Sequence, residues 1–414
     1  MKIEKAETNN AVVTRLKNVR KHPNADRLQL ATVAGDTVIV GLEAKEDDLV
    51  IYFDSNLSLG IEYCKANNLY SNPELNSDTT KKGYFSKNGR VKAQKLRGEN
   101  SYGYVATLES LNFIEKNIQL DEGVEFQRIN GIKVCEKYVP VNVARKELNK
   151  EKNNKKVKKV LTNAFPEHWD TKQFKRFVDS VPVGRMIYLE EKCHGSSMRT
   201  SHVPCYRDLT LIDKILKFFK HPIAEFEFLH MNGTRRVCLT KRTTPANSFY
   251  KGDMREVAFN KVKDQLHKNE QIYCEIYGYD TNGSPVQKGF PYGCQQGEHK
   301  VMLYRLTFNN EDGKVFDMGR EYVYRRAEEL GLEKPHLFEK YYYTGDKEEL
   351  IRKVESYTDG RSMIDTGTLR EGVVCWFEDE AGHWTCLKNK SFDFLNFESK
   401  QKDDENFIDI EDEN

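Results

Sequence analysis

Short apolar runs separated by turn residues fill the first third of the chain, and they limit what it can fold into. Runs rich in valine, isoleucine and leucine lie within residues 11–54, and Gly89, Gly98 and Gly103 punctuate further short runs beyond a polar loop. The runs follow one another without the spacing of an amphipathic helix, which predicts strands. About five short strands in roughly 130 residues favour a small β-barrel. We therefore predict a β-barrel domain over residues 1–140.

A second pattern covers residues 161–400. Strand-like runs such as RMIYLEEK, QIYCEIYGY and GVVCWFED alternate there with amphipathic stretches such as EYVYRRAEELG. This alternation predicts an α+β domain with antiparallel sheets. Another amphipathic stretch, LIDKILKFFK, lies between Val203 and Arg235. We expect it to form a surface helix packed on the domain, with a partner-binding helix as the alternative.

Charge is concentrated in two short segments. Residues 141–160 include eight basic residues and two glutamates between Arg145 and Lys159, which predicts a linker that is either solvated or in contact with phosphate groups. Residues 401–414 carry seven acidic residues and predict a disordered tail. Because 65 basic residues balance 64 acidic ones, attraction to a polyanion must come from local patches.

The remaining composition restricts the compartment. The nine cysteines are dispersed and none forms a C-x-x-C pair, which favours buried reduced thiols over disulfides or a zinc site. No stretch approaches the roughly 20 apolar residues of a membrane span, and the first ten residues lack the apolar core of a signal peptide. We expect a cytoplasmic protein with no membrane partner; the oligomeric state stays open.

The segment LEEKCHGSSMR, from Leu189 to Arg199, is the most informative for chemistry. A strand-like run delivers Lys192, and Gly195 then allows the chain to turn tightly and approach a ligand. A lysine is protonated near neutral pH and acts as a nucleophile only where burial or neighbouring cations lower its pKa. If only the four residues from Lys192 to Gly195 are considered, a surface salt bridge is the more common role of such a lysine.

Five segments follow Lys192 in a set order: CLTKRTTPAN, YCEIYGYD, KVMLYRLTF, REGVVCWF and CLKNKSF. With LEEKCHGSS ahead of them, they resemble the motifs of the covalent nucleotidyltransferases, the superfamily of ATP-dependent ligases and capping enzymes. The Lys-x-His-Gly form is typical of RNA ligases that seal breaks in duplexes. The approach FPEHWDTKQFKRFVDSVPVG and the earlier HPNADRLQLATV and KLRGENSYGYV resemble the RNA ligase branch with an OB domain ahead of the catalytic domain.

The resemblance implies an architecture. It predicts an N-terminal OB-type β-barrel followed by an ATP-grasp-like nucleotidyltransferase domain. Because only about two dozen residues follow Lys390, we expect no C-terminal OB domain.

The resemblance also implies a nucleotide site. Lys192 becomes covalently linked to AMP, and Lys388 and Lys390, if they alternate on a strand, put both amines on one face to hold the α-phosphate and lower the pKa of Lys192. Glu191 lies near the adenine, and Tyr304 stacks on it. A core tyrosine and a solvated basic edge are the alternatives for Tyr304 and the lysine pair.

The remaining implied roles concern phosphate, ribose and metal. Arg199 and Arg242 contact ribose or phosphate oxygens. Glu275 and Glu371 orient Mg²⁺ or Mn²⁺, whose preference for hard oxygen ligands suits carboxylates and bound water. For either glutamate alone, a surface salt bridge is the alternative.

His194 and the last motif depart from the wider superfamily. Many relatives carry an aspartate at the position of His194, and a neutral imidazole cannot replace that charge, so we expect it to bond a backbone or sugar group. In CLKNKSF the register can slide, so that Cys386 and Lys388 take the places of the two motif lysines.

Together these observations predict an ATP-dependent RNA ligase that joins 3′-hydroxyl and 5′-phosphate ends of RNA, in a duplex or at a nick. Two alternatives stay open: a non-catalytic protein that binds RNA or tRNA through a ligase-like domain, and a ligase that acts on DNA-containing nicks.

Overall fold

The computed structural model describes residues 1–139, 160–240 and 254–401. The predicted basic linker, the acidic tail and Arg242 lie outside these residues. Contacts divide the described chain into two compact units. We call residues 1–139, 172–178 and 390–401 the first unit, and residues 160–171, 179–240 and 254–389 the second unit.

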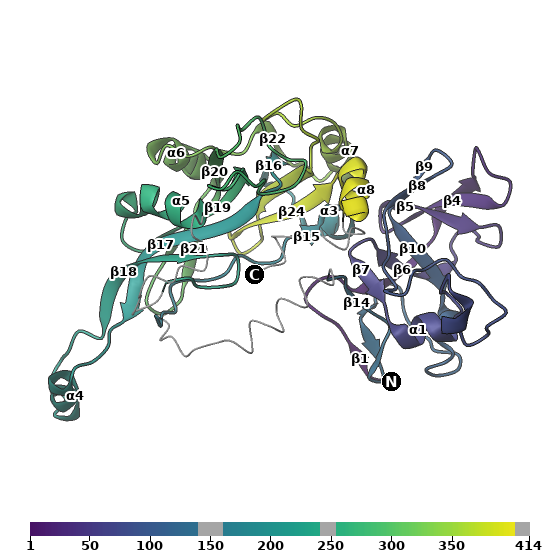
Figure 1. Ribbon diagram of the computed structural model, residues 1–414, viewed down its shortest axis with the longest axis horizontal. Helices are drawn as coiled ribbons and strands as arrows, with labels where there is room; N and C mark the ends of the chain where they lie inside the picture. Colours follow the sequence, from purple (N-terminus) through teal and green to yellow (C-terminus); the bar gives the residue numbers. More distant parts are fainter. Residues whose placement is uncertain (140–159, 241–253, 402–414) are drawn as a thin grey trace. The chain divides into compact units, whose positions relative to one another are not determined.

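The first unit is built from short antiparallel strands (Figure 1). The largest sheet has the order β10-β6-β2-β11, and a meander of β3, β4 and β5 forms another. The strands are β1 (Ile3–Glu4), β2 (Ala11–Arg15), β3 (Lys17–Lys21), β4 (Leu28–Val33), β5 (Asp36–Gly41), β6 (Leu49–Asp54), β7 (Leu57–Leu59), β8 (Gln94–Leu96), β9 (Glu99–Ser101), β10 (Gly103–Thr107), β11 (Glu125–Phe126), β12 (Arg128–Ile129), β13 (Ile132–Lys133), β14 (Cys135–Lys137) and β15 (Lys172–Gln173). Its α-helices are α1 (Ile61–Ala66), α3 (Phe174–Phe177) and α8 (Phe392–Gln401).

Alternation along the strands accounts for the core of the first unit. In β2 and β6, Val13, Ile51 and Phe53 enter one apolar cluster, while Val12 and Tyr52 enter a second. Successive side chains of a strand point to opposite faces, so both faces of this sheet are covered. The predicted run of short strands is confirmed; its closure into an OB-type barrel stays a prediction.

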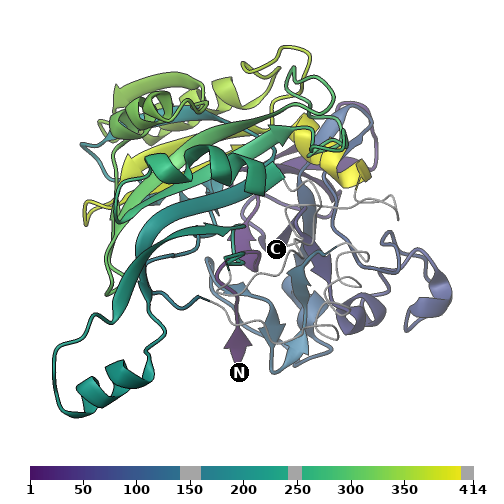
Figure 2. The ribbon, with the colours of Figure 1, turned by 60° about the vertical axis from the view of Figure 1, so that its left-hand side comes forward.

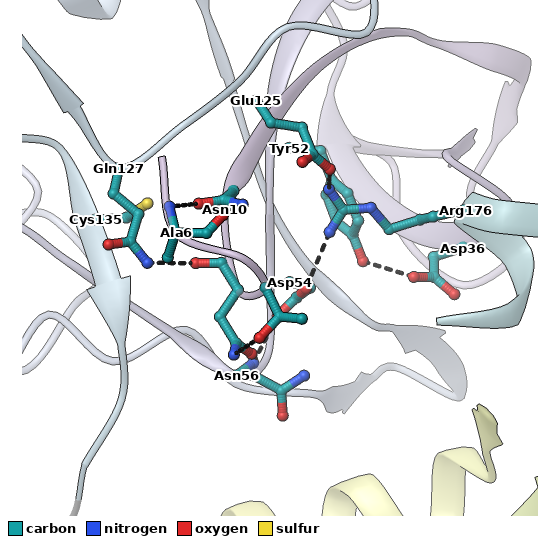
Figure 3. A network of polar contacts seen from close by, with 12 residues as sticks. Ala6, Asn10, Asp36, Tyr52, Asp54, Asn56, Glu125, Gln127, Cys135 and Arg176 are labelled. Carbon is teal, nitrogen blue, oxygen red and sulfur yellow. Dashed lines mark hydrogen bonds and ion pairs between the residues drawn. The ribbon is translucent and has the colours of Figure 1, made fainter. Parts of the chain in front are cut away.

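The short helix α3 belongs to the first unit because of a buried ionic network (Figure 3). Arg176 places its guanidinium between the carboxylates of Asp54, at 3.4 Å, and Glu125, at 2.8 Å. Burial raises the pKa of Asp54, and the positive charge of Arg176 opposes that rise. Nearby, the Tyr52 hydroxyl donates to Asp36 at 2.9 Å. The sequence assigned residues 172–178 and 390–400 to the second domain, whereas their contacts group them with residues 1–139.

The second unit contains two sheets with helices between and beside the strands (Figures 1 and 2). One sheet includes the order β24-β23-β16-β22, and the other has the order β18-β17-β19-β20-β21. The strands are β16 (Met186–Lys192), β17 (Ser196–Tyr206), β18 (Phe226–Gly233), β19 (Glu270–Gly278), β20 (His299–Asn309), β21 (Val315–Asp317), β22 (Leu337–Tyr342), β23 (Gly372–Glu378) and β24 (Trp384–Lys390). The helices are α4 (Leu211–Phe218), α5 (Met254–Val262), α6 (Arg320–Glu329) and α7 (Lys347–Thr358).

Helices α5 and α6 cover one face of the second sheet. Ala258 of α5 and Val323 of α6 join Ile272 of β19 and Leu303 of β20 in one apolar cluster. The strand pairs β16–β22, β16–β23, β17–β18, β17–β19, β19–β20 and β20–β21 are antiparallel. The predicted α+β class with antiparallel sheets is therefore confirmed.

Three further predictions meet the structure here. Helix α4 forms, but none of its residues is buried, so the expectation that it packs on the domain is wrong. All nine cysteines are free and eight of them are buried, which confirms reduced thiols. No helix in the described part of the chain is long and apolar enough to cross a membrane.

Candidate functional site

Lys192 lies at the end of β16, where the strand register sets it opposite Gly372 of β23. Its ammonium nitrogen lies 2.9 Å from the carboxylate of Glu371, the residue just before that strand. The carboxylate side chain is fully buried, while the lysine side chain keeps 22% of its surface exposed. The sheet therefore brings together two predicted site residues that are far apart in the sequence, with part of the lysine side chain exposed.

The turn after Lys192 has room only for a glycine. A Cβ on Gly195 would lie 2.2 Å from the backbone oxygen of Ile276, closer than such atoms approach. This close approach allows the Gly195 amide to donate to the Glu275 carboxylate at 3.1 Å. Ser197 donates to the other oxygen of the same carboxylate at 3.4 Å. Glu275, on β19, is thus held against the turn that carries Lys192.

Three carboxylates surround the turn. The thiol of Cys193 has its pKa raised, chiefly by burial and then by the negative charges of Glu275, Glu371 and Glu191; the charge of Lys192 opposes this rise. Among the described residues, no group of three or more histidine, cysteine or acidic side chains could hold a metal ion by itself. Carboxylate oxygens such as those of Glu275 and Glu371 are the hard ligands that Mg²⁺ and Mn²⁺ prefer.

Glu191 has a buried acceptor that has no hydrogen-bond partner among the described residues. One carboxylate oxygen accepts the backbone N–H of Met363 at 2.8 Å. The other oxygen, Oε1, is buried without a hydrogen-bond partner. An unsatisfied buried acceptor costs roughly 1–3 kcal/mol, so this atom suits a hydrogen-bond donor from a ligand.

His194 lies beside Glu371, and the bond expected between its imidazole and a backbone or sugar group stays a prediction. Its backbone N–H donates to the Tyr292 hydroxyl at 2.8 Å, and its ring meets the Phe290 ring edge-on, with 4.9 Å between centroids. Its Nδ1 lies 3.9 Å from a carboxylate oxygen of Glu371. The His194 ring therefore lies between Phe290 and Glu371, the ion-pair partner of Lys192.

His168, which the sequence analysis did not single out, lies beside Tyr304. The two rings are 5.3 Å apart and edge-on, and Arg305 Nη1 lies 3.4 Å from the histidine Nδ1. Burial lowers the pKa of His168 well below its ordinary value, and the charges of Arg305, Arg235, Lys192 and Lys388 lower it further. The sequence offered one signal for this residue: His168 is the histidine of the segment FPEHWDTK, which precedes the Lys192 motif.

Tyr304 projects from β20 and is half-buried. Burial, reinforced by the charge of Glu275, raises the pKa of its hydroxyl above the ordinary range, so the ring is neutral. An uncharged, partly exposed aromatic ring is what stacking on a flat base requires.

The two lysines of the last motif, Lys388 and Lys390, belong to different units. Lys388 and Lys390 alternate along β24, and Lys388 is half-buried within the second unit, where its charge acts on His168 together with that of Lys192. Lys390 belongs to the first unit, 3.6 Å from Glu398 and 4.7 Å from the ring centre of Phe394. Lys388, unlike Lys390, therefore belongs to the same unit as Lys192, and the charges of both lysines lower the pKa of His168.

The guanidinium of Arg199 is hydrogen-bonded to other parts of the protein. Its guanidinium donates to the backbone oxygens of Phe165 at 3.0 Å, Thr234 at 2.9 Å and Arg236 at 3.2 Å. The side chain is buried, and burial lowers the pKa of the guanidinium. These contacts describe an arginine that ties loop backbones together.

Comparison with known proteins supports the fold. No protein-family model and no curated protein sequence matches the chain. Among solved structures, an RNA ligase from Naegleria gruberi aligns with 94–95% of this chain and 98–99% of its own length at 15–16% identity. The TM-score is 0.62 for a variant with ATP and Mn, 0.60 for the protein with PPi and 0.58 for another variant with AMP and Mn. The chain therefore has the fold of an RNA ligase over nearly its whole length.

Proposed function

We propose that this protein is an ATP-dependent RNA ligase that joins 3′-hydroxyl and 5′-phosphate ends through a lysyl-AMP intermediate. The observation that carries the proposal is the Lys192 amine, 2.9 Å from buried Glu371, on a side chain that is partly exposed. The motif order and the likeness to a ligase described with ATP, AMP and Mn support it.

The reaction needs three phosphoryl transfers. The Lys192 nitrogen attacks the α-phosphorus of ATP and pyrophosphate leaves; the 5′-phosphate oxygen of RNA then attacks the lysyl-AMP and takes the adenylate. Finally the 3′-hydroxyl attacks that 5′-phosphate and AMP leaves. Each step gathers negative charge on the oxygens around phosphorus, so catalysis consists mainly of positioning and charge stabilisation.

The residues around Lys192 suit these demands. Glu371 holds the ammonium in place, and the proton must leave that nitrogen before it attacks. Lys388 would meet the α-phosphate. Glu275 and Glu371 would hold Mg²⁺ or Mn²⁺ through water, and the bound ion would neutralise charge on the phosphates.

The adenine has its own candidate partners. The unsatisfied Oε1 of Glu191 would accept the exocyclic amine, and the ring of Tyr304 would stack on the base. Lys390 and Arg242 keep the roles that the resemblance implies, whereas the Arg199 guanidinium bonds to three backbone oxygens and is assigned no nucleotide contact.

The first unit would act as an OB-type domain that holds the strand with the 3′-hydroxyl. A-form RNA is read through shape, phosphates and 2′-hydroxyl groups, so we expect little sequence preference. The basic residues 141–160 would add phosphate contacts.

Incubation with α-labelled ATP and Mg²⁺ or Mn²⁺, followed by a denaturing gel, tests the first step. We expect a labelled protein band for the wild type and for Lys353→Met, and none for Lys192→Met. Lys353 is a matched control because it is 25% exposed and pairs with Glu339 at 2.5 Å. An unlabelled wild type would reject the ligase and favour a non-catalytic RNA-binding protein.

A second assay separates the RNA ligase from a ligase of DNA-containing breaks. Nicked duplexes of one sequence, with ribose or deoxyribose exchanged on either side of the nick, are compared for sealing by the adenylated enzyme. The proposal requires efficient sealing of the all-RNA nick. Sealing confined to deoxyribose ends would assign the activity to DNA.

A further inference from the structure

Helix α4 stands apart from the rest of the second unit, at the end of the two long strands β17 and β18 (Figures 1 and 2). Its first turn is stabilised locally: Thr210 accepts the backbone N–H of Asp213 at 3.1 Å, and Asp213 accepts that of Thr210 at 2.8 Å. This capping box forms without tertiary packing. The helix is therefore ordered by its own sequence while none of its residues is buried.

One face of α4 is entirely apolar. At 100° per residue, six large side chains fall within an arc of about 160°. They are Leu211, Ile212, Ile215, Leu216, Phe218 and Phe219, and their exposed fractions run from 37% to 81%. Such a contiguous exposed patch, unlike a single exposed leucine, marks a surface that is covered in use.

The opposite face is basic. Lys214, Lys217 and Lys220 lie there against a single acid, Asp213, which Arg207 neutralises at 3.0 Å. Lys217 pairs with Glu225 at 2.8 Å. Around the helix axis, Lys214 borders one edge of the apolar arc. Lys220 follows the helix in a left-handed backbone conformation, with a φ of 59°, and adds a further positive charge at the C-terminal end of the helix.

We infer that α4 is a membrane-surface helix that inserts its apolar face into an anionic lipid bilayer and leaves its lysines among the headgroups. A helix with a wide apolar arc rich in leucine and phenylalanine and a lysine-bearing polar face lies in the plane of such an interface. Each lysine near an anionic surface strengthens binding about fivefold, and long side chains reach the headgroups from the helix edge.

The wide apolar arc and the lysines beside it also argue against other binding partners for this face of α4. A second copy would bring lysine-bordered faces together, and like charges repel. RNA would engage the lysines and leave the apolar arc in water. A helix bound in a protein groove is anchored at i, i+3, i+4 and i+7, a set that Ile212, Ile215, Leu216 and Phe219 supply, but Leu211 and Phe218 widen the arc to almost half the circumference and would stay in water. The sequence argument against a membrane partner concerned spans of about 20 residues and does not apply to a helix that lies on the surface.

Co-sedimentation of the full chain with vesicles tests the inference. We expect binding to phosphatidylcholine vesicles containing about one-third phosphatidylglycerol and weak binding to phosphatidylcholine alone. The double variant Ile215→Asn/Phe218→Asn should lower the partition coefficient at least about tenfold, because it removes two apolar side chains from the inserted face. Lys214→Gln/Lys220→Gln should lower it about tenfold or more on the anionic vesicles only.

Phe316→Asn is the matched control, since Phe316 is 56% exposed on β21 and Ile215 is 57% exposed. It should bind vesicles like the wild type, and all variants should keep the adenylylation activity and circular dichroism of the wild type. No wild-type binding to anionic vesicles, or equal binding by the apolar variant, overturns the inference. So does a lipid-free dimer, or RNA binding, that the apolar variant abolishes.

Discussion

Two buried glutamates of one sheet each hold a cation, and the two pairs differ in how completely they are enclosed. Glu190 on β16 receives both guanidinium branches of Arg320, each at 2.6 Å, and the hydroxyl of Tyr324. Arg320 also donates to the Tyr304 backbone oxygen at 2.6 Å and stacks on Trp376 at 4.5 Å. This pair is saturated and sealed from water.

Glu371 instead receives the flexible ammonium of Lys192, which keeps part of its surface exposed. An ammonium is a point charge on a flexible stem and can be exchanged for another cation, whereas a bidentate arginine fork cannot be replaced without loss of two bonds. We call Glu190–Arg320 the closed pair and Glu371–Lys192 the open pair. The difference in enclosure indicates that the closed pair stabilises the fold, whereas the open pair is accessible to a ligand.

The largest effect should come from the open pair. Glu371→Gln should slow lysine adenylylation about a thousandfold, because it removes the charge that holds the Lys192 amine and that we propose to orient the metal, a contribution of several kcal/mol. Single-turnover labelling with ATP measures this. Glu339→Gln, which also breaks a lysine pair, should leave the rate within a few fold; a loss of equal size there would erase the distinction.

The closed pair should respond in stability. Glu190→Gln should lower the free energy of unfolding by about 3 kcal/mol, because the buried charge of Arg320 loses its counter-ion. Urea unfolding monitored by tryptophan fluorescence gives the value. The folded variant should adenylylate at a rate close to that of the wild type; a stable but inactive variant would show that Glu190 takes part in the chemistry.

Arg199 provides an intermediate case. Arg199→Lys should destabilise the protein by about 1–3 kcal/mol, because one ammonium cannot satisfy the three backbone oxygens that the guanidinium reaches. The KM for ATP should stay unchanged. If unfolding is unaltered and the KM rises at least about tenfold, the arginine contacts the nucleotide, as the resemblance implied.

The smallest effect concerns pH. The pKa of His168 is lowered on folding, so the unfolded chain binds the proton more readily and stability falls as the pH drops below about 6.5. His168→Gln should remove about 1.4 kcal/mol of this loss for each pH unit until the folded pKa is reached. Urea unfolding at about pH 7.5 and about pH 5.5 provides the comparison. His230 and His299, whose pKa values burial also lowers, remain in both proteins and cancel. An unchanged pH difference would contradict the assignment.

The sequence reached the site through its motifs and missed what surrounds it. Strand β16 and the glycine turn follow from local sequence, because a short strand-like apolar run and a residue without Cβ are visible in one segment. The adjacent acids of LEEK look equivalent in the sequence. Their roles separate only because alternation sends Glu190 toward Arg320 and Glu191 toward the Met363 amide.

Two predictions from the sequence, for Arg199 and for helix α4, differ from the structure because they depended on distant residues. Arg199 was expected at a ligand because its segment resembles a motif, yet three loop oxygens supplied by distant residues occupy its donors. The amphipathic pattern of α4 was expected to pack, and periodicity does predict the helix and its apolar face. Whether another element of the chain covers that face depends on where the ends of β17 and β18 lie.

The sequence by itself determined the strands, the turn glycine, the helix that β17 and β18 flank and the residue types able to attack or hold phosphate, because propensity and spacing act over a few residues. Tertiary structure decided which charges meet. Lys192 and Glu371 are separated by 179 positions, and the antiparallel register of β16 and β23 closes that distance to 2.9 Å. Burial, which depends on every element around a side chain, then decided which ionic pair is sealed and which stays open to a substrate.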